Sequence, residues 1–156
     1  MSKEPAMQDR NEISRPNTVL RLQGATLSPR EHLSARHLLL RVMRLIAIGG
    51  LNDAAAAAVL FGQFGRGHRR ALILMRALML ELSRTSHRQI ALAPPCCGRI
   101  TRDEAVILRA LARTESDFAA CHDDARLLLG RDTALGAATC FQAVAACFAD
   151  LGAPFD

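Results

Sequence analysis

The stretch "HRRALILMRALMLELSRTS", residues 68–86, is the most apolar segment of the sequence and has the periodicity of a helix. At about 100° per residue, its apolar side chains cover well over a third of the helix circumference. These side chains are Ala71, Leu72, Leu74, Met75, Leu78, Met79 and Leu82. We therefore predict that this segment is the central helix of the fold and that neighbouring elements enclose it.

Two aliphatic residues, Ile73 and Leu80, lie on the other, charged face of this helix, close to Arg69 and Arg76. Aliphatic side chains in such surroundings need a cover, which is either another helix of the chain or a second molecule. The pattern indicates a candidate partner surface at Ile73, Arg76 and Leu80. The alternative is that they are single exposed aliphatics, which ordinary monomers also have.

Two helices are predicted before the central one. The first covers residues 29 to about 48, because Ser28 and Glu31 have the spacing of a capping box. The second covers residues 53–64, with Asn52 as its cap. The polar residues assigned to the solvent side of the first helix are Arg36, His37, Arg41 and Arg44.

Three helices are predicted after the central one. Thr101 and Glu104 form a second capping-box pattern, so a helix is expected over residues 102–113. Ser116 is the expected cap of a helix over 117–129. The last helix is expected to start at Asp132 or Thr133 and to end at Gly152.

The prediction is therefore an all-α fold, a compact orthogonal array of five to six helices around a central apolar helix. A chain of 156 residues has the usual length of one domain. We place this domain at residues 28–156. Residues 1–27 show no sustained periodicity and are expected to form a disordered, flexible N-terminal arm.

The sequence "APPCCGRIT", residues 93–101, interrupts the helices, and residues 89–91 before it have the only strand-like signal. Adjacent cysteines lack C-x-x-C spacing, so one metal ion cannot easily bind both. We interpret the stretch as a structural turn that joins two helical halves, and we expect no cofactor. The alternative is a thiol or metal sensor at Cys96, Cys97 and His87. The other three cysteines are expected to be buried: Cys121, Cys140 and Cys147.

Basic residues cluster where the central helix begins, at Arg66, His68, Arg69 and Arg70. The N-terminus of a helix attracts anions, so these side chains are candidates for contact with an anion or a nucleic acid. A helix that reads DNA, however, needs one solvent-exposed face with side chains that hydrogen-bond to base edges. This helix has no Lys, Asn or Gln for such contacts. We prefer the interpretation that the arginines are solvated or paired within the fold.

Charge is distributed unevenly along the chain. Residues 1–100 carry 15 Lys and Arg against 6 Asp and Glu, whereas residues 101–156 carry 5 against 9. The basic part is expected to pair with the acidic part, either within one fold or between two copies.

Enzymatic motifs are missing: there is no G-x-S-x-G, H-E-x-x-H, P-loop or G-x-G-x-x-G. The first thirty residues lack an apolar stretch of signal-peptide length, and no run of 18 apolar residues occurs. We therefore expect a non-enzymatic, cytoplasmic protein with no membrane partner and with reduced thiols.

The motifs "RRALILMRALMLELSR" and "APPCCGRIT", together with the final "DLGAPFD", resemble an uncharacterised family of short helical proteins from alphaproteobacteria. The resemblance spans about residues 38–156. It implies a bacterial setting and no functional residue.

The function we predict is that of a small regulatory or adaptor protein, which acts through protein–protein contacts or by forming a homodimer. Two alternatives stay open. One is a nucleic-acid- or anion-binding helical regulator that uses the basic start of the central helix, and the other is a thiol or metal sensor at the APPCC stretch.

Overall fold

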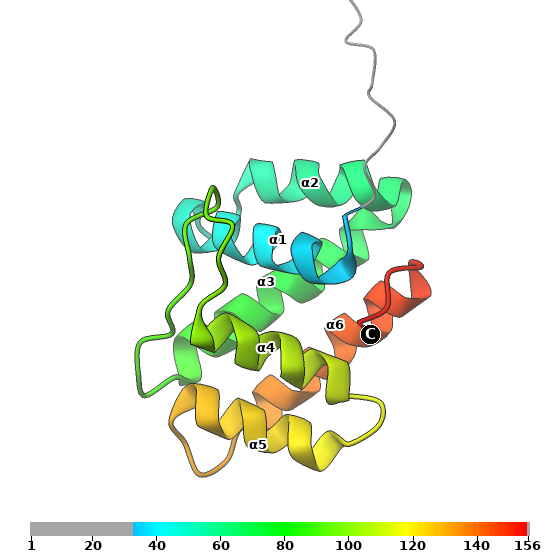
Figure 1. Cartoon of the computed structure of the whole chain (residues 1–156). Helices are drawn as coiled ribbons and strands as arrows, with labels where there is room; N and C mark the ends of the chain where they lie inside the picture. Colours follow the sequence, from blue (N-terminus) through cyan, green and yellow to red (C-terminus); the bar gives the residue numbers. More distant parts are fainter. Residues whose placement is uncertain (1–32, 156) are drawn as a thin grey trace, which may run out of the picture.

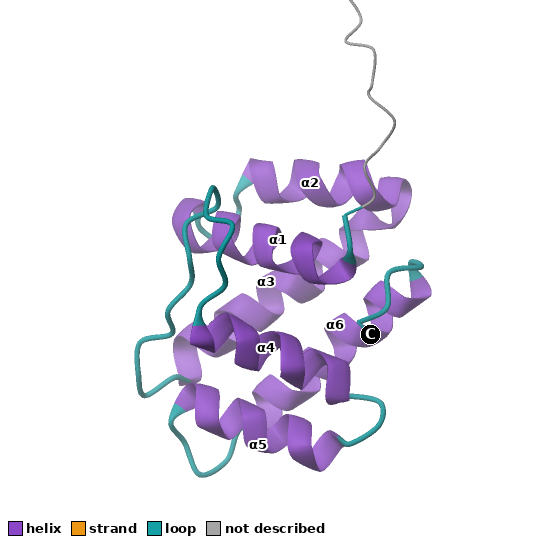
Figure 2. Ribbon diagram, in the orientation of Figure 1, coloured by secondary structure: helices purple, strands orange, loops and turns teal. Residues whose placement is uncertain are grey.

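A computed structural model describes residues 33–155, which form α-helices and loops without a strand (Figures 1 and 2). The helices are α1 (Ala35–Gly49), α2 (Ala54–Phe64), the short 3-10 helix η1 (Gly65–Gly67), α3 (His68–Thr85), α4 (Arg102–Arg113), α5 (Phe118–Leu129) and α6 (Leu135–Asp150). The all-α prediction is confirmed. The arm predicted for residues 1–27 lies outside the described part of the chain.

The central position predicted for residues 68–86 is confirmed, since α3 packs against α1, α2 and α6. In Figure 1, α3 passes behind α1 and links the α1–α2 pair to the lower helices. Its inner face is buried through Ala71, Leu72, Met75, Leu78 and Leu82. The outer face is open to solvent, so the helix is enclosed on one side and not on all sides.

α6 is a second central helix, a role that its sequence does not indicate. It contacts α3, α4 and α5, and it runs antiparallel to α3. The ends of the pair show this direction: Arg70 bonds to Asp150, and the carboxylate of Glu81 lies against Gly136. The hydrophobic core includes residues of all six α-helices, with Phe141 and Phe148 as its largest fully buried side chains.

Several helix starts differ from the prediction by a few residues. α1 begins at Ala35 and not at 29, because Leu33 and Ser34 are non-helical and the hydroxyl of Ser34 accepts the N–H of His37 at 3.4 Å. The predicted capping residues Ser28 and Glu31 lie outside the described range.

Neighbouring carboxylates replace two of the predicted caps. Asp53, not Asn52, accepts the N–H of Ala56 at 2.7 Å at the start of α2. Asp117, not Ser116, caps α5 in the same way. An ionised acceptor binds an N–H more strongly than a neutral one, which favours the aspartates. α6 begins at Leu135, after Asp132 and Thr133, and has no side-chain cap.

Among residues 33–155, no helix is both long enough and apolar enough to cross a membrane.

The two faces of α3 should respond differently to truncation. Leu78→Ala, on the fully buried face, is expected to lower the free energy of unfolding by about 2–5 kcal/mol, because it leaves a cavity in the core. Ile73→Ala, on the open face of the same helix, should change it by less than about 0.5 kcal/mol. Urea unfolding followed by far-UV circular dichroism measures both, and equal losses would contradict the burial of Leu78 and the exposure of Ile73.

Candidate functional site

A long loop, residues 86–101, joins α3 to α4 and contains the APPCC stretch. It rises beside α1, turns, and descends to the start of α4 (Figure 1). At its tip the N–H of Cys97 donates to the carbonyl of Pro94 at 2.9 Å, which closes the turn. The APPCC stretch therefore turns between two helical segments, as predicted. The strand-like signal at residues 89–91 produces no strand, because Ala91 bonds to side chains of Asp103 and Thr101 instead of to another strand.

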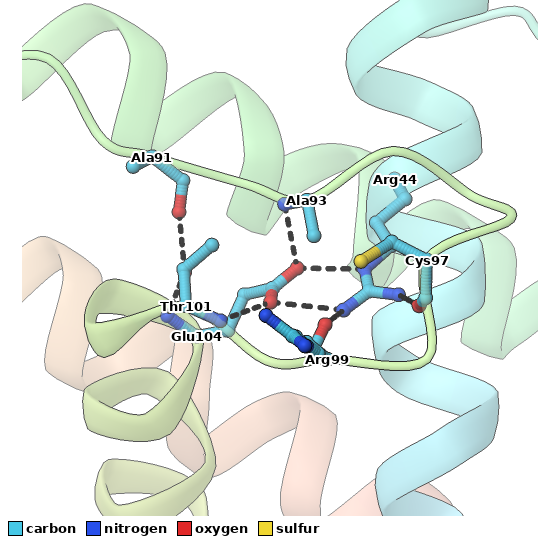
Figure 3. A network of polar contacts seen from close by, with 7 residues as sticks. All are labelled: Arg44, Ala91, Ala93, Cys97, Arg99, Thr101 and Glu104. Atoms are coloured by element: carbon cyan, nitrogen blue, oxygen red, sulfur yellow. Dashed lines mark hydrogen bonds and ion pairs between the residues drawn. The ribbon is translucent and has the colours of Figure 1, made fainter.

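A buried ion pair between Arg44 of α1 and Glu104 of α4 holds this loop (Figure 3). The guanidinium donates to the carboxylate twice, from Nε to Oε1 at 2.7 Å and from Nη2 to Oε2 at 2.9 Å. It also donates to two loop carbonyls, those of Cys97 at 2.6 Å and of Arg99 at 2.8 Å. The side chains of Arg44 and Glu104 are 7% and 0% exposed. We call this pair, with the loop groups it binds, the clamp.

The carboxylate of Glu104 also binds backbone on both sides of the loop tip. It accepts the N–H of Ala93 at 3.1 Å and that of Thr101 at 2.8 Å, the latter completing the predicted capping box. Burial by itself would raise the pKa of Glu104, but the hydrogen bonds from Arg44, Thr101 and Ala93 outweigh it and place this pKa below its ordinary value. Glu104 is therefore ionised at neutral pH.

The preceding residue, Asp103, fixes the earlier part of the loop. It forms an ion pair with Arg88 and accepts the N–H of Ala91 at 2.7 Å. The hydrogen bonds from Arg88 lower the pKa of Asp103, burial opposes them, and the bond from Ala91 adds to the lowering. Two consecutive carboxylates in the first turn of α4 thus bind different parts of one loop.

The prediction that Arg44 faces solvent is wrong. Leu40 and Arg44, one turn apart on α1, are both buried, so the buried face of this helix is wider than its apolar residues alone indicate. The sequence did carry a partial signal, the basic first hundred residues and the acidic remainder. Pairing between these parts within one fold is confirmed by three ion pairs: Arg44–Glu104, Arg88–Asp103 and Arg70–Asp150.

A cavity of about 430 Å³ opens between α1, the loop and α4. Its lining includes four basic side chains, Arg36, His37, Arg41 and Arg44, and no carboxylate. Cys97 also contributes to the lining, together with apolar side chains from α1, the loop and α4. This cavity could not be predicted from the sequence, because its wall combines α1 with a distant loop and α4.

The cysteines are placed very differently. Cys96 is exposed at the loop tip, Cys97 is half-buried, and Cys121 is buried, as predicted. Burial, together with the nearby Asp124, raises the pKa of Cys121 to about 11. Cys140 is only half-buried and Cys147 is buried, and burial raises the pKa of both.

The third residue of the proposed thiol or metal set, His87, is exposed, and its N–H donates to the carbonyl of Leu129 at the end of α5 at 2.9 Å. Within residues 33–155, no three His, Cys, Asp or Glu side chains come close enough to form a metal site.

The basic residues at the start of α3 are partly engaged within the fold. Arg70 bonds to Asp150 at 2.8 Å on the surface. The Nδ1 atom of His68 lies 2.7 Å from the carbonyl of Gly65, and its ring meets Phe61 edge-on at 5.1 Å. Arg66 and Arg69 are exposed.

The candidate partner surface on α3 is open. Ile73 is 64% exposed and Leu80 is 40% exposed, with the exposed Ala77 between them. Arg76 is half-buried, and its Nε atom is buried without a hydrogen-bond partner in the described part of the chain.

A family model described as "Family of unknown function (DUF6628)" matches residues 23–146. The match begins inside the predicted arm and ends before the final "DLGAPFD" segment. No curated protein and no solved structure matches the chain.

The clamp should make a large contribution to stability. Arg44→Met is expected to lower the free energy of unfolding by about 3–5 kcal/mol, because it leaves the Glu104 carboxylate buried without its cation. The matched control is Arg70→Met, which breaks a solvent-exposed pair and should cost at most about 1 kcal/mol.

The effect of Arg44→Met should depend on pH. In the wild type the pKa of Glu104 is lowered by folding, so the ionised carboxylate contributes fully to the free energy of unfolding above about pH 5, and this contribution is lost as the pH falls through the folded-state pKa. In Arg44→Met, protonation neutralises the stranded carboxylate, so the difference in the free energy of unfolding between wild type and variant should shrink toward acid pH. A difference independent of pH, measured by urea unfolding, would argue against the clamp.

Thiol reactivity should follow burial. In the native protein, timed alkylation with iodoacetamide and peptide mass spectrometry should show Cys96 reacting at least about tenfold faster than Cys121, whose raised pKa and burial suppress the thiolate. Cys96→Ser should remove the fast phase. Comparable rates at both residues would contradict the described burial.

Proposed function

From the premise that this chain belongs to the DUF6628 family, a family of unknown function, we propose that it is a non-enzymatic regulatory or adaptor protein that acts by binding another protein. The observation that carries this proposal is the open outer face of α3. The setting we propose is the bacterial cytoplasm, in keeping with the resemblance of its motifs and with five cysteines that form no disulfide.

Ile73, Ala77 and Leu80 form a row on one face of α3, which we call the α3 strip. Their spacing of four and three residues places them one above another along the helix. Single exposed aliphatics are ordinary, but three apolar residues at this spacing have the pattern of the anchors by which a helix docks in a groove of its partner. The rigid, buried opposite face of α3 presents the strip in a fixed position.

The charges around the α3 strip indicate the kind of partner. Arg69, Arg76 and Arg84 lie beside it, and Glu81 is the acidic residue of this helix. Two copies meeting through the same face would bring their arginines together, which is unfavourable. We therefore propose a partner of a different sequence, with an apolar surface flanked by Asp or Glu. A homodimer through this strip is the alternative, and light scattering tests it.

Exposed side chains support two alternative functions, contact with a nucleic acid and thiol sensing. Exposure of Arg66 and Arg69 supports contact with a nucleic acid at the start of α3, although Arg70 is already paired with Asp150. Exposure of Cys96 supports a role as a thiol sensor. Each is a proposal secondary to protein binding.

Site-specific photocrosslinking in the native host tests the α3 strip. A photoreactive amino acid in place of Ile73 or Leu80 should give a discrete adduct with another protein. The control position is Leu127 on α5, which is 62% exposed and lies outside the strip, and which should give none.

A second variant makes the test specific. Adding Arg76→Glu to the crosslinking protein should weaken the adduct, because the partner is expected to be acidic. Adducts at Leu127 as strong as those at Ile73, adducts formed only between two copies, or adducts unaffected by the Arg76 change would overturn the proposal. Far-UV circular dichroism checks that each variant is folded.

A further inference from the structure

We propose that the cavity between α1 and the APPCC loop binds a small organic anion, in which a carboxylate or phosphate group is attached to a hydrocarbon portion. The cavity does not include the α3 strip, so this site is independent of the proposed protein contact. Its volume of about 430 Å³ lies in the usual range of about 300–1,000 Å³ for small-molecule sites.

The anionic group follows from the charges of the cavity wall. Arg36, His37, Arg41 and Arg44 line it, and none of the lining residues is acidic. The charge of Arg44 is balanced by Glu104. Arg41 is exposed and makes no ion pair within the described residues, so its charge is available to a ligand. An anion in this cavity would therefore meet a net positive field.

Arg44 adds a donor in a fixed position. A guanidinium has five N–H groups, and four are used in the bonds to Glu104 and to the carbonyls of Cys97 and Arg99. One N–H of Nη1 is left, on a side chain that lines the cavity and is held rigidly by the clamp. A donor fixed in this way loses little entropy when a ligand binds.

The hydrocarbon portion follows from the remaining wall. Leu40 of α1, Ile100 of the loop and Leu108 of α4 line the same cavity. Ile100 is 54% exposed, although it belongs to a loop held on both sides of the tip by the clamp. A ligand with an apolar body would cover this side chain. Inorganic phosphate or acetate would pair with the basic side chains of the cavity but leave its apolar side chains exposed to water.

Titration of the full-length protein, monitored by ¹H–¹⁵N NMR, tests the site with hexanoate and hexyl phosphate as probes. Saturable shifts are expected for backbone amides of residues 36–44 and 97–100. Acetate and inorganic phosphate should bind more weakly, because they lack the apolar portion, and hexanol should bind more weakly, because it lacks the charge. If hexyl phosphate binds and hexanoate does not, the anionic group is a phosphate, and the reverse result assigns a carboxylate.

Matched variants locate the binding. Arg41→Gln should weaken hexanoate or hexyl phosphate binding at least about tenfold, whereas Arg66→Gln, an exposed arginine on η1, should leave it unchanged. Ile100→Ser should weaken both probes but not acetate. The proposal is overturned by shifts that do not saturate, by equal losses in the two arginine variants, or by hexanol binding as well as hexanoate. Single-stranded DNA that binds at the same amides more tightly than either probe would also overturn it, in favour of a nucleic-acid surface.

Discussion

Removing a guanidinium and a carboxylate from water costs several kcal/mol for each ion, and a buried pair is stable only when its polar atoms are hydrogen-bonded. Arg44 and Glu104 meet this condition. Each carboxylate oxygen of Glu104 accepts two N–H groups, and the guanidinium divides its donors between that carboxylate and two loop carbonyls. The pair is therefore compatible with one path of the loop and one spacing between α1 and α4. The cavity beside the loop depends on that spacing.

The uneven charge distribution along the chain supplies the partners of the clamp and of two further ion pairs. The basic partners lie on α1, α3 and the loop, and the acidic partners lie on α4 and at the end of α6. Long-range attraction between the two parts favours the correct assembly of the first three helices with the last three. Burial then decides how much each pair contributes, since the surface pair Arg70–Asp150 is screened by solvent and the clamp is not.

Much of the fold could be predicted because apolar periodicity is a local property. The bounds of α3 and α4 follow within a residue from glycine breaks, capping patterns and the apolar face. The exact caps of α2 and α5 do not, since two adjacent polar residues compete for the same N–H groups. The central role of α6 could not be predicted, because its many alanines show little contrast between faces, although they allow close packing against α3, α4 and α5.

For the candidate sites too, features that depend on one helix could be predicted, and features that depend on residues distant in the sequence could not. The position of Ile73 and Leu80 on the charged face of α3 could be predicted, because it depends on a single helix, whereas the absence of another helix of the described chain over them could not. The burial of Arg44 could not, because it depends on Glu104, sixty residues away in the chain. The cavity beside Arg44 could not be predicted for the same reason: its walls are far apart in the sequence.

The clamp has a consequence for the continuity of the backbone. Glu104 binds the loop at Ala93, before the tip, and at Thr101, after it, while Arg44 of the first half binds carbonyls that belong to the second. A single proteolytic cut between Pro95 and Cys96 would therefore break the backbone at a place where hydrogen bonds of Arg44 and Glu104 still connect the residues before the cut to those after it. The two pieces, each with three of the α-helices described for residues 33–155, would remain associated as a nicked but native-like molecule, and the halves expressed separately are natural candidates for fragment complementation.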